Sequence, residues 1–251
     1  MVRFPPRRSL KWPFTIIALI AAIAGRAMPA TAAPLQDTIL VRKVQNFIVT
    51  GDGSAEAWNA IPWTGLPHQT LRGALYATRV KIAYSESGIY FLFDCVDEKL
   101  SASFKKDFLD LWTQDVVEVF LWTDENFPAY LEYELSPLNY ELALLISNHD
   151  GEVYRWQPFH YEGRQRTSHA THVVGGIKKP GASVKGWTAE FFIPYRLLRP
   201  LNNNVPAPGT RWRANLCRVD YDNEKDVSEW SWQTTDRSFH EYKKFGVLLF
   251  E

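Results

Sequence analysis

The chain has 251 residues, with 28 Lys and Arg balanced by 28 Asp and Glu, so its formal net charge is zero. A balanced chain offers no general field for nucleic acid or an anionic membrane, which excludes partners recognised by charge alone. The length suffices for one large domain with a substantial core, and the 10 Trp and 11 Tyr suit ligand surfaces as well as cores, because their rings join an apolar face to a polar edge.

Residues 1–32 are predicted to be a secretory signal peptide. Basic residues precede an apolar run from Trp12 to Ala24, and Ala30-Thr31-Ala32 supplies a cleavage site of small residues. The apolar run is too short to span a membrane. We therefore expect export to the periplasm or the cell exterior, no membrane attachment after cleavage, and a mature domain over residues 33–251.

The mature part has the pattern of a β-protein. The stretch at 78–98 contains two β-rich runs joined by the hairpin signal Ser85-Glu86-Ser87-Gly88. Further runs follow at 115–122, 129–137, 141–148, 171–177, 186–194, 210–221 and 245–251. The only helical candidates are short, at 55–59 and 194–200. Many short strands separated by turn signals predict an all-β, antiparallel sandwich with a few short helical turns.

The strand at 116–122 carries a carboxylate in an otherwise apolar run. Glu118 lies at its centre, and the two-residue period of a strand places it on the same face as Phe120. An unpaired Glu in a dry core would be costly. Glu118 is therefore expected either to pair with a buried cation, such as Arg213 or Arg218, or to face a ligand.

Five stretches, in order along the chain, resemble the family 9 carbohydrate-binding modules. They are GDGSAEAWNAIPW (51–63), the hairpin at 78–100, LWTQDVVEVFLW (111–122), GWTAEFFIPYRLL (186–198) and FHEYKKFGVLLF (239–250). The third is similar to the W-x-Q-D-x-V-E-[IV]-F motif of that family. The resemblance covers nearly the whole mature chain and implies a jelly-roll-like β-sandwich.

The resemblance also implies a ligand site. In modules of this type that bind sugar, two Trp rings sandwich a terminal sugar and polar side chains hold its hydroxyls. Trp112 matches the first ring position, Phe239 stands where the second Trp is expected, and Glu118 matches a hydrogen-bonding position. Gln114, in the same motif as Trp112, is a further ligand-binding candidate.

Three more residues complete the predicted ligand-binding set. Glu134 and Ser136 stand where the family has Arg followed two residues later by Asn, which leaves the sugar open. Trp156, in a polar and loop-like stretch at 152–160, offers an extra stacking surface. The remaining strand and loop tryptophans are predicted to pack in the core: Trp58, Trp63, Trp187, Trp212, Trp230 and Trp232.

Carboxylates gather at two strand ends. Asp94 and Asp97 end one strand, and Asp220, Asp222 and Asp226 follow another. Such groups could hold a structural Ca²⁺, which takes several oxygen ligands, although a contiguous calcium loop is absent and solvated turn residues are the alternative. No other cofactor is predicted. The histidines lack metal-ligand spacing, and both methionines leave with the signal peptide, which excludes haem held by an axial Met and His.

The sequence thus predicts an exported, non-catalytic domain that binds carbohydrate and is linked to polysaccharide breakdown, acting alone or beside glycoside hydrolases. One alternative is an enzyme that hydrolyses O-glycosyl bonds with a carboxylate pair such as Glu118 and Glu134; Asp115 and Glu118 point to opposite faces and cannot form that pair. Another is a β-sandwich protein-interaction module that has lost sugar binding. Cys95 and Cys217 are either paired or buried free thiols.

Overall fold

The computed structural model describes residues 37–70, 73, 75–222 and 227–251. The predicted signal peptide, residues 1–32, lies outside the described residues, and so does Asp226. In the described part of the chain, no helix combines the length and the hydropathy needed to cross a membrane.

Strands dominate the described residues, with four short 3₁₀ turns between them. The strands are β1 (Thr38–Lys43), β2 (Thr64–Gly65), β3 (Thr78–Tyr84), β4 (Gly88–Val96), β5 (Val116–Trp122), β6 (Ala129–Leu135), β7 (Glu141–His149), β8 (Glu152–Pro158), β9 (Ser168–Val174), β10 (Gly186–Pro194), β11 (Arg211–Asp220), β12 (Ser228–Ser231) and β13 (Gly246–Phe250). The turns are η1 (Glu56–Ala60), η2 (Leu111–Thr113), η3 (Gly163–Gln165) and η4 (Tyr242–Lys244).

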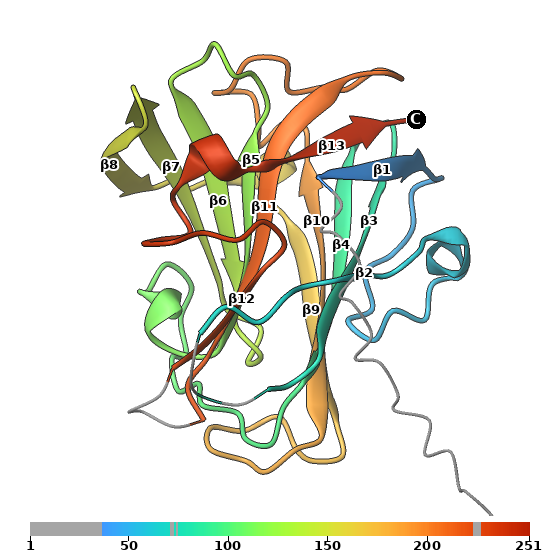
Figure 1. Ribbon diagram of the computed structural model, residues 1–251. Helices are drawn as coiled ribbons and strands as arrows, with labels where there is room; N and C mark the ends of the chain where they lie inside the picture. The colour runs from blue at the N-terminus through green and yellow to red at the C-terminus, as the bar shows by residue number, and fades with distance from the viewer. Residues whose placement is uncertain (1–36, 71–72, 74, 223–226) are drawn as a thin grey trace, which may run out of the picture. The chain divides into compact units, whose positions relative to one another are not determined.

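The strands form one hydrogen-bonded path that curls into two layers (Figure 1). Its order is β8-β7-β6-β5-β11-β13-β1-β3-β4-β10-β9, with β12 added to β11 and β2 added to β3. The two pairings of β1, with β13 and with β3, are parallel, and the others are antiparallel. The predicted all-β sandwich is confirmed, and β1 is the strand that joins its two halves.

Strand β5 is buried on both faces, which explains its almost continuous apolar sequence. Val117, Val119 and Leu121 face the main core between the layers. Phe120 and Trp122 face a second apolar cluster on the other side of the same strand. Because side chains alternate along a strand, Glu118 lies on the side of this second cluster and outside the main core.

Several elements differ from the sequence expectations. The stretch at 152–160 was expected to be a loop, but most of it forms β8, an edge strand whose largely exposed side chains leave no apolar pattern to read. Strand β9 begins at Ser168, three residues before the expected start. In the stretch 194–200, Pro194 ends β10 and residues 195–200 form turns and no helix.

The predicted packing residues lie mostly where expected. Five tryptophans are fully buried: Trp58, Trp187, Trp212, Trp230 and Trp232. Trp63 is half-buried, with the Arg79 guanidinium 4.3 Å from its ring centroid. Cys95 and Cys217 are both buried free thiols, so the disulfide alternative is wrong.

Candidate functional site

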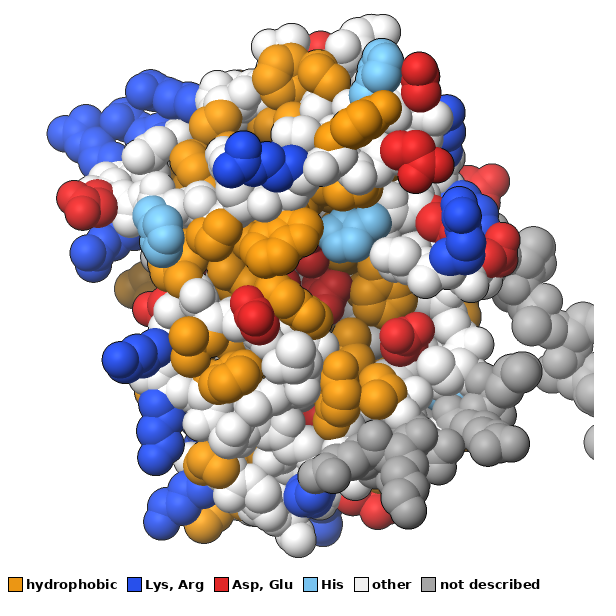
Figure 2. Space-filling view, turned by 90° about the vertical axis from the view of Figure 1, so that its left-hand side faces the viewer, with side chains coloured by type: hydrophobic (Ala, Val, Ile, Leu, Met, Phe, Trp, Pro, Cys, Tyr) orange, Lys and Arg blue, Asp and Glu red, His pale blue; other side chains and the backbone are white. Residues whose placement is uncertain are grey.

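A cavity of about 600 Å³ lies on the face of β5 and β6 that is turned away from the main core, and its volume is typical of small-molecule sites, roughly 300–1,000 Å³. It is lined by Gln69, Thr70, Trp112, Glu118, Glu132, Leu144, Trp156, Val219, Tyr221, Glu229 and residues 235–240. Figure 2 shows acidic side chains deep in a hollow of this side of the molecule, among hydrophobic side chains and next to a histidine.

Two glutamates form the floor of the cavity, and a third lies on the same face of the sheet. Glu118 on β5 is directly opposite Glu134 on β6, and Glu132 precedes Glu134 by two residues, so the strand period places all three on one face. Glu118 and Glu132 line the cavity, although each is only 3% exposed. Glu134, the cross-strand neighbour of Glu118, is completely buried and does not line the cavity. We call these residues the glutamate cluster.

Burial governs the protonation of the glutamate cluster. Burial, and then the charge of Glu229, raise the pKa of Glu118 to about 8. Burial and then the charge of Glu118 raise the pKa of Glu132. Burial and the charges of Glu132 and Glu118 raise the pKa of Glu134. The nearby Trp112 backbone N–H lowers this pKa by a smaller amount, although it forms no hydrogen bond of normal geometry with the carboxyl group. These raised pKa values favour the protonated carboxyls, which can donate hydrogen bonds as well as accept them.

Aromatic rings form the walls of the cavity. Trp112 projects from η2 and Trp156 from β8, and their ring centroids are 5.6 Å apart with planes at 73°. The Tyr221 hydroxyl donates to the Trp112 carbonyl at 3.0 Å and so fixes the backbone of η2. Phe239 contributes a third ring from the loop before β13.

The loop at 233–241 covers one side of the cavity and is held at several points. Its Gln233 N–H donates to Asn215 Oδ1 at 2.9 Å, and its Thr235 N–H donates to Gln69 Oε1 at 2.9 Å. His240 Nδ1 lies 2.8 Å from the Tyr130 hydroxyl, and His240 Nε2 lies 3.8 Å from Glu132 Oε2. These contacts hold the loop in place and set His240 beside Glu132.

The structure brings four of the predicted ligand-binding residues to this one cavity: Trp112, Glu118, Trp156 and Phe239. Gln114 lies outside it, because its side-chain oxygen accepts from the N–H groups of Ser103 and Phe104 at 2.5 and 3.2 Å. The Ser136 hydroxyl accepts from the Tyr140 N–H at 3.2 Å and is also outside. A ligand-binding role stays a prediction for every residue of the predicted set, inside and outside the cavity.

Sequence reasoning missed several residues of the cavity. Glu132 had a readable signal, since it shares a face with Glu134 in the alternating run at 129–135. Glu229 and His240 had none, because only the pairing of β12 with β11 and the course of the 233–241 loop bring them to the cavity.

The expected alternative of a Glu–Arg ion pair at Glu118 is wrong. Arg213 lies 3.7 Å from Glu125. Arg218 lies within ion-pair distance of Asp97 and Asp220. Neither arginine pairs with Glu118, which faces the cavity instead.

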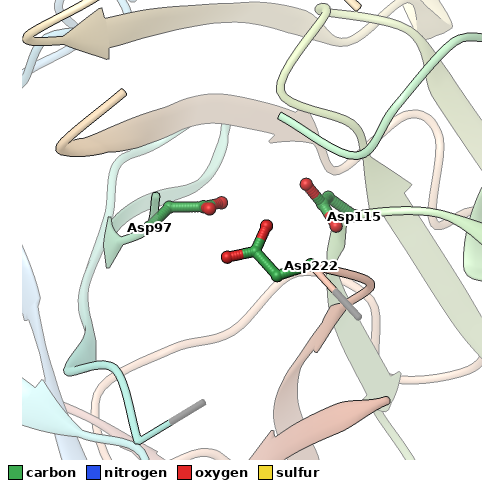
Figure 3. A group of neighbouring side chains, drawn as sticks. All are labelled: Asp97, Asp115 and Asp222. Atoms are coloured by element: carbon green, nitrogen blue, oxygen red, sulfur yellow. The ribbon is translucent and has the colours of Figure 1, made fainter. Parts of the chain in front are cut away.

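A second polar group lies behind the cavity, around Asp97, Asp115 and Asp222. Figure 3 shows these carboxylates pointing toward one another, and their oxygens lie within 4.8 Å of each other. Asp115 accepts from the N–H groups of Ser101 and Tyr221 at 2.5 and 2.8 Å. The group thereby supports Tyr221, which lines the cavity.

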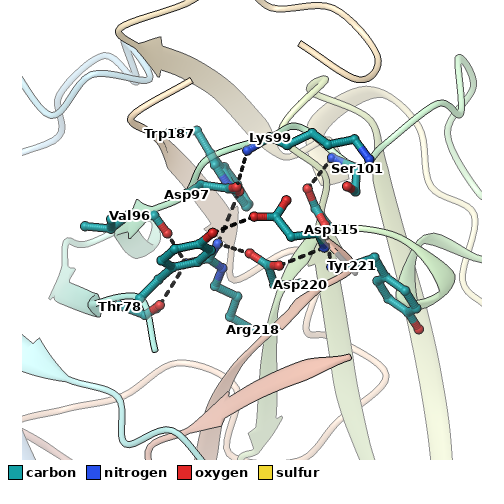
Figure 4. A network of polar contacts seen from close by, with 12 residues as sticks. Thr78, Val96, Asp97, Lys99, Ser101, Asp115, Trp187, Arg218, Asp220 and Tyr221 are labelled. Carbon is teal, nitrogen blue, oxygen red and sulfur yellow. Dashed lines mark hydrogen bonds and ion pairs between the residues drawn. The ribbon is translucent and has the colours of Figure 1, made fainter. Parts of the chain in front are cut away.

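Arg218 occupies the centre of the same network (Figure 4). Its guanidinium donates to Asp97 at 3.1 Å, to Asp220, and to the Val96 carbonyl at 2.7 Å. Asp97 and Asp220 are each only 1% exposed. For Asp97 and Asp220 the alternative of solvated turn residues is therefore wrong, and these strand ends meet in a buried charged network.

The aspartates fit the chemistry of the expected Ca²⁺. Carboxylate oxygens are the ligands this ion prefers, and Asp222 Oδ1 is buried without a hydrogen-bond partner among the described residues. Burial raises the pKa of Asp97 to about 7 despite the opposing charge of Arg218, which indicates that one cation does not compensate all the carboxylates. Asp97, Asp115 and Asp222 are the residues that would hold the ion.

Comparisons with known proteins point in one direction. The family model described as "Carbohydrate family 9 binding domain-like" matches residues 49–251. A solved structure from Bacteroides uniformis ATCC 8492, titled as a carbohydrate-binding protein, has a TM-score of 0.70 at 17% identity and covers 85% of this chain and 99% of its own. No curated protein matches the chain.

Two further solved structures contain a family 9 carbohydrate-binding module from Caldicellulosiruptor kristjanssonii. The complex with cellotriose has a TM-score of 0.60 at 16% identity and covers 85% of this chain and 93% of its own. The complex with glucose has a TM-score of 0.58 at 18% identity and covers 85% of this chain and 95% of its own. Likeness at these identities establishes a shared fold.

Proposed function

Because the chain belongs to the carbohydrate family 9 binding domain-like proteins, we propose that its cavity binds the end of a carbohydrate chain without cleaving it. The observation that carries this proposal is the position of three aromatic rings, Trp112, Trp156 and Phe239, around a floor of buried carboxyls in one cavity. Related modules from C. kristjanssonii were solved with cellotriose and with glucose.

The chemistry of the cavity suits a sugar. The C–H faces of a sugar ring pack on aromatic faces, and sugar hydroxyls require donors and acceptors in fixed directions. Protonated Glu118 and Glu132 supply both kinds of hydrogen bond from the floor. The cavity has room for one or a few sugar units rather than a long chain, which favours recognition of a chain end.

We also propose an extracytoplasmic setting. The predicted signal peptide at 1–32 supports export, and sugar binding by an exported domain supports a role in polysaccharide breakdown beside glycoside hydrolases. Detection of a mature N-terminus near Ala33 in periplasmic or secreted fractions would test the export step. Recovery of the full-length precursor in the cytoplasm alone would contradict it.

A glycan array followed by titration calorimetry with the mature protein tests sugar binding. We expect binding of oligosaccharides through a chain end, with Trp156→Ala weakening it. Tyr154→Ala is a matched control, because Tyr154 lies on the same strand, is 68% exposed and does not line the cavity. Absence of binding to every glycan by a folded protein would contradict the proposal and favour a protein-interaction module.

Glycoside hydrolysis remains a second candidate, because Glu118 and Glu132 both line the cavity and both have raised pKa values. Against it, these two side chains lie side by side on one floor, whereas a hydrolytic pair flanks the scissile bond. Release of reducing sugar from a bound oligosaccharide, abolished by Glu118→Gln, would establish hydrolysis. Binding without any product supports the first candidate.

A further inference from the structure

The surplus of carboxyl groups in the cavity requires an explanation that neutral sugars do not provide. Glu118 is directly opposite Glu134, and Glu132 is on the same face, with none of the three more than 3% exposed. In their ionised forms, directly opposed carboxylates destabilise a sheet, and an unpaired buried charge is costly. Neutral sugars can be bound with far fewer acidic groups.

The protein supplies little positive charge to this cluster. Among the described residues, the one ion pair of the three glutamates joins Glu132 Oε2 to His240 Nε2 at 3.8 Å. Burial lowers the pKa of His240, which favours its neutral form. Arg237 lines the cavity, but its side chain is 82% exposed and pairs with Glu241 at 3.2 Å. The cluster therefore has unused capacity for a cation.

The cluster also has unused hydrogen-bond acceptors. Glu132 Oε2 and both carboxyl oxygens of Glu134 are buried and have no hydrogen-bond partner among the described residues. Of these groups, Glu132 lines the cavity and can be reached by a ligand. An ammonium group offers three donors and no acceptor, and its hydrogen bonds to carboxylates are stronger than those of a neutral hydroxyl.

We propose that the cavity prefers a sugar that carries a free primary amino group, such as a 2-amino-2-deoxyhexose unit, over the corresponding neutral sugar. This inference rests on the proposed function, because it assigns a ligand class to the same cavity. The ammonium group binds Glu118 and Glu132, and the sugar ring packs on the aromatic walls. The faces of Trp112 and Trp156 add cation–π attraction for the same group.

Proton release gives the proposal a distinctive signature. Burial raises the pKa of Glu118 to about 8 and raises the pKa of Glu132 and Glu134, so the empty cluster holds protons. An entering ammonium group favours the ionised carboxylates, and protons leave as it binds. Other titratable groups around the cluster are Asp110 before η2, Cys217 and Tyr221 at β11, Glu229 on β12, and Asp236, Arg237 and His240 on the 233–241 loop.

Titration calorimetry of the mature protein near neutral pH, in two buffers of different ionisation enthalpy, tests the proposal with four probes. The probes are glucose, glucosamine, N-acetylglucosamine and methylamine. We expect glucosamine to bind about tenfold more tightly than glucose, with proton release. N-acetylglucosamine, which keeps the ring but loses the charge, should show no such gain, and methylamine, which lacks the ring, should bind far more weakly.

Substitutions test whether the preference for glucosamine comes from the glutamate cluster. Glu132→Gln should bring the affinities for glucosamine and glucose to about the same value, whereas Glu152→Gln, an exposed substitution on β8 outside the cavity, should leave both affinities unchanged. If Glu132→Gln does not fold, Glu229→Gln serves instead, since Glu229 is half-buried and lines the cavity. It should reduce the preference.

The possible failures are distinguishable. Equal affinity for glucose and glucosamine, or methylamine binding as tight as glucosamine, overturns the amino-sugar proposal and leaves the proposed function standing if glucose binds. Failure of a folded protein to bind any sugar, here and on the glycan array, overturns both proposals. A preference that survives Glu132→Gln and Glu229→Gln unchanged also overturns the assignment to the cluster.

Discussion

At the scale of single residues, Trp112 stands on a three-residue turn and in neither layer of the sandwich, so its ring contributes more to the cavity than to the core. We expect Trp112→Ala to weaken sugar binding about tenfold with little change in stability, since a stacked ring contributes roughly 0.5–1.5 kcal/mol beyond its buried area. The fully buried Trp187 is the control, because Trp187→Ala should cost about 3–5 kcal/mol of stability. Calorimetry and thermal unfolding measure both effects, and equal destabilisation would place Trp112 in the core.

Phe239 offers a gain-of-function test at the same scale. It lines the cavity and is half-buried, and its phenyl ring has less area than an indole and no N–H donor. We expect Phe239→Trp to tighten sugar binding several-fold, provided that the 233–241 loop accepts the larger ring. Unchanged affinity in a variant that unfolds at the normal temperature would remove Phe239 from the ligand contacts.

At the scale of elements, the pairing of β5 with β6 makes stability depend on pH. The unfolded pKa of a Glu is near 4.5, whereas burial raises the folded pKa of Glu118 to about 8 and raises that of Glu134. Between these values the folded state binds more protons than the unfolded state. The contribution of these carboxyls to the stability of the fold is therefore fully present below about pH 4.5, and it is lost as the pH rises through about 8.

Thermal unfolding across this pH range should show the loss directly. We expect the unfolding temperature to fall as the pH rises from about 4.5 to about 8, and Glu134→Gln to flatten the slope because it removes one titrating group. Glu241→Gln is the control, since hydrogen bonds from Lys244 and neighbouring groups lower the pKa of Glu241 to about 2. The titration of Glu241 therefore changes stability only at acidic pH. The same slope in the wild type and in Glu134→Gln would show that Glu134 ionises normally.

Asp97, Asp115 and Asp222 form a candidate cation site, and the hydrogen bond from the Tyr221 N–H to Asp115 connects it to the cavity. We expect Ca²⁺ to raise the unfolding temperature and a chelator to lower it, because a ligand that binds only the folded state stabilises it. Asp115→Asn should abolish this difference. Asp94→Asn should keep it, since Asp94 pairs with Arg79 and stands outside the group. Identical unfolding with Ca²⁺ and with chelator would remove the ion from this site.

At the scale of the whole molecule, the strands that could be predicted are those with a buried face. The apolar runs at 78–96 and at 116–122 arise from the burial of these strands, so they are visible in the sequence. Strand β8 is mostly exposed, and no such signal marks it. The resemblance to the family motif identified Trp112 and Glu118 as site residues. Glu229 reaches the cavity only through strand pairing, which local sequence does not encode.

Closure of the sandwich depends on β1, which pairs with β13 on one side and with β3 on the other. Val41 of this strand is fully buried in the main core, whereas its neighbour Leu40 is 45% exposed. We expect Val41→Asp to cost roughly 3–5 kcal/mol, because it places an unpaired charge in an apolar core. Leu40→Asp should change stability by less than about 1 kcal/mol, since its side chain stays in water.

Denaturant unfolding measures these free energies of unfolding, and amide hydrogen exchange reports where protection is lost. Val41→Asp should remove protection in β3 and β13 together, because β1 links them; loss confined to β1 would show that each half holds its structure independently.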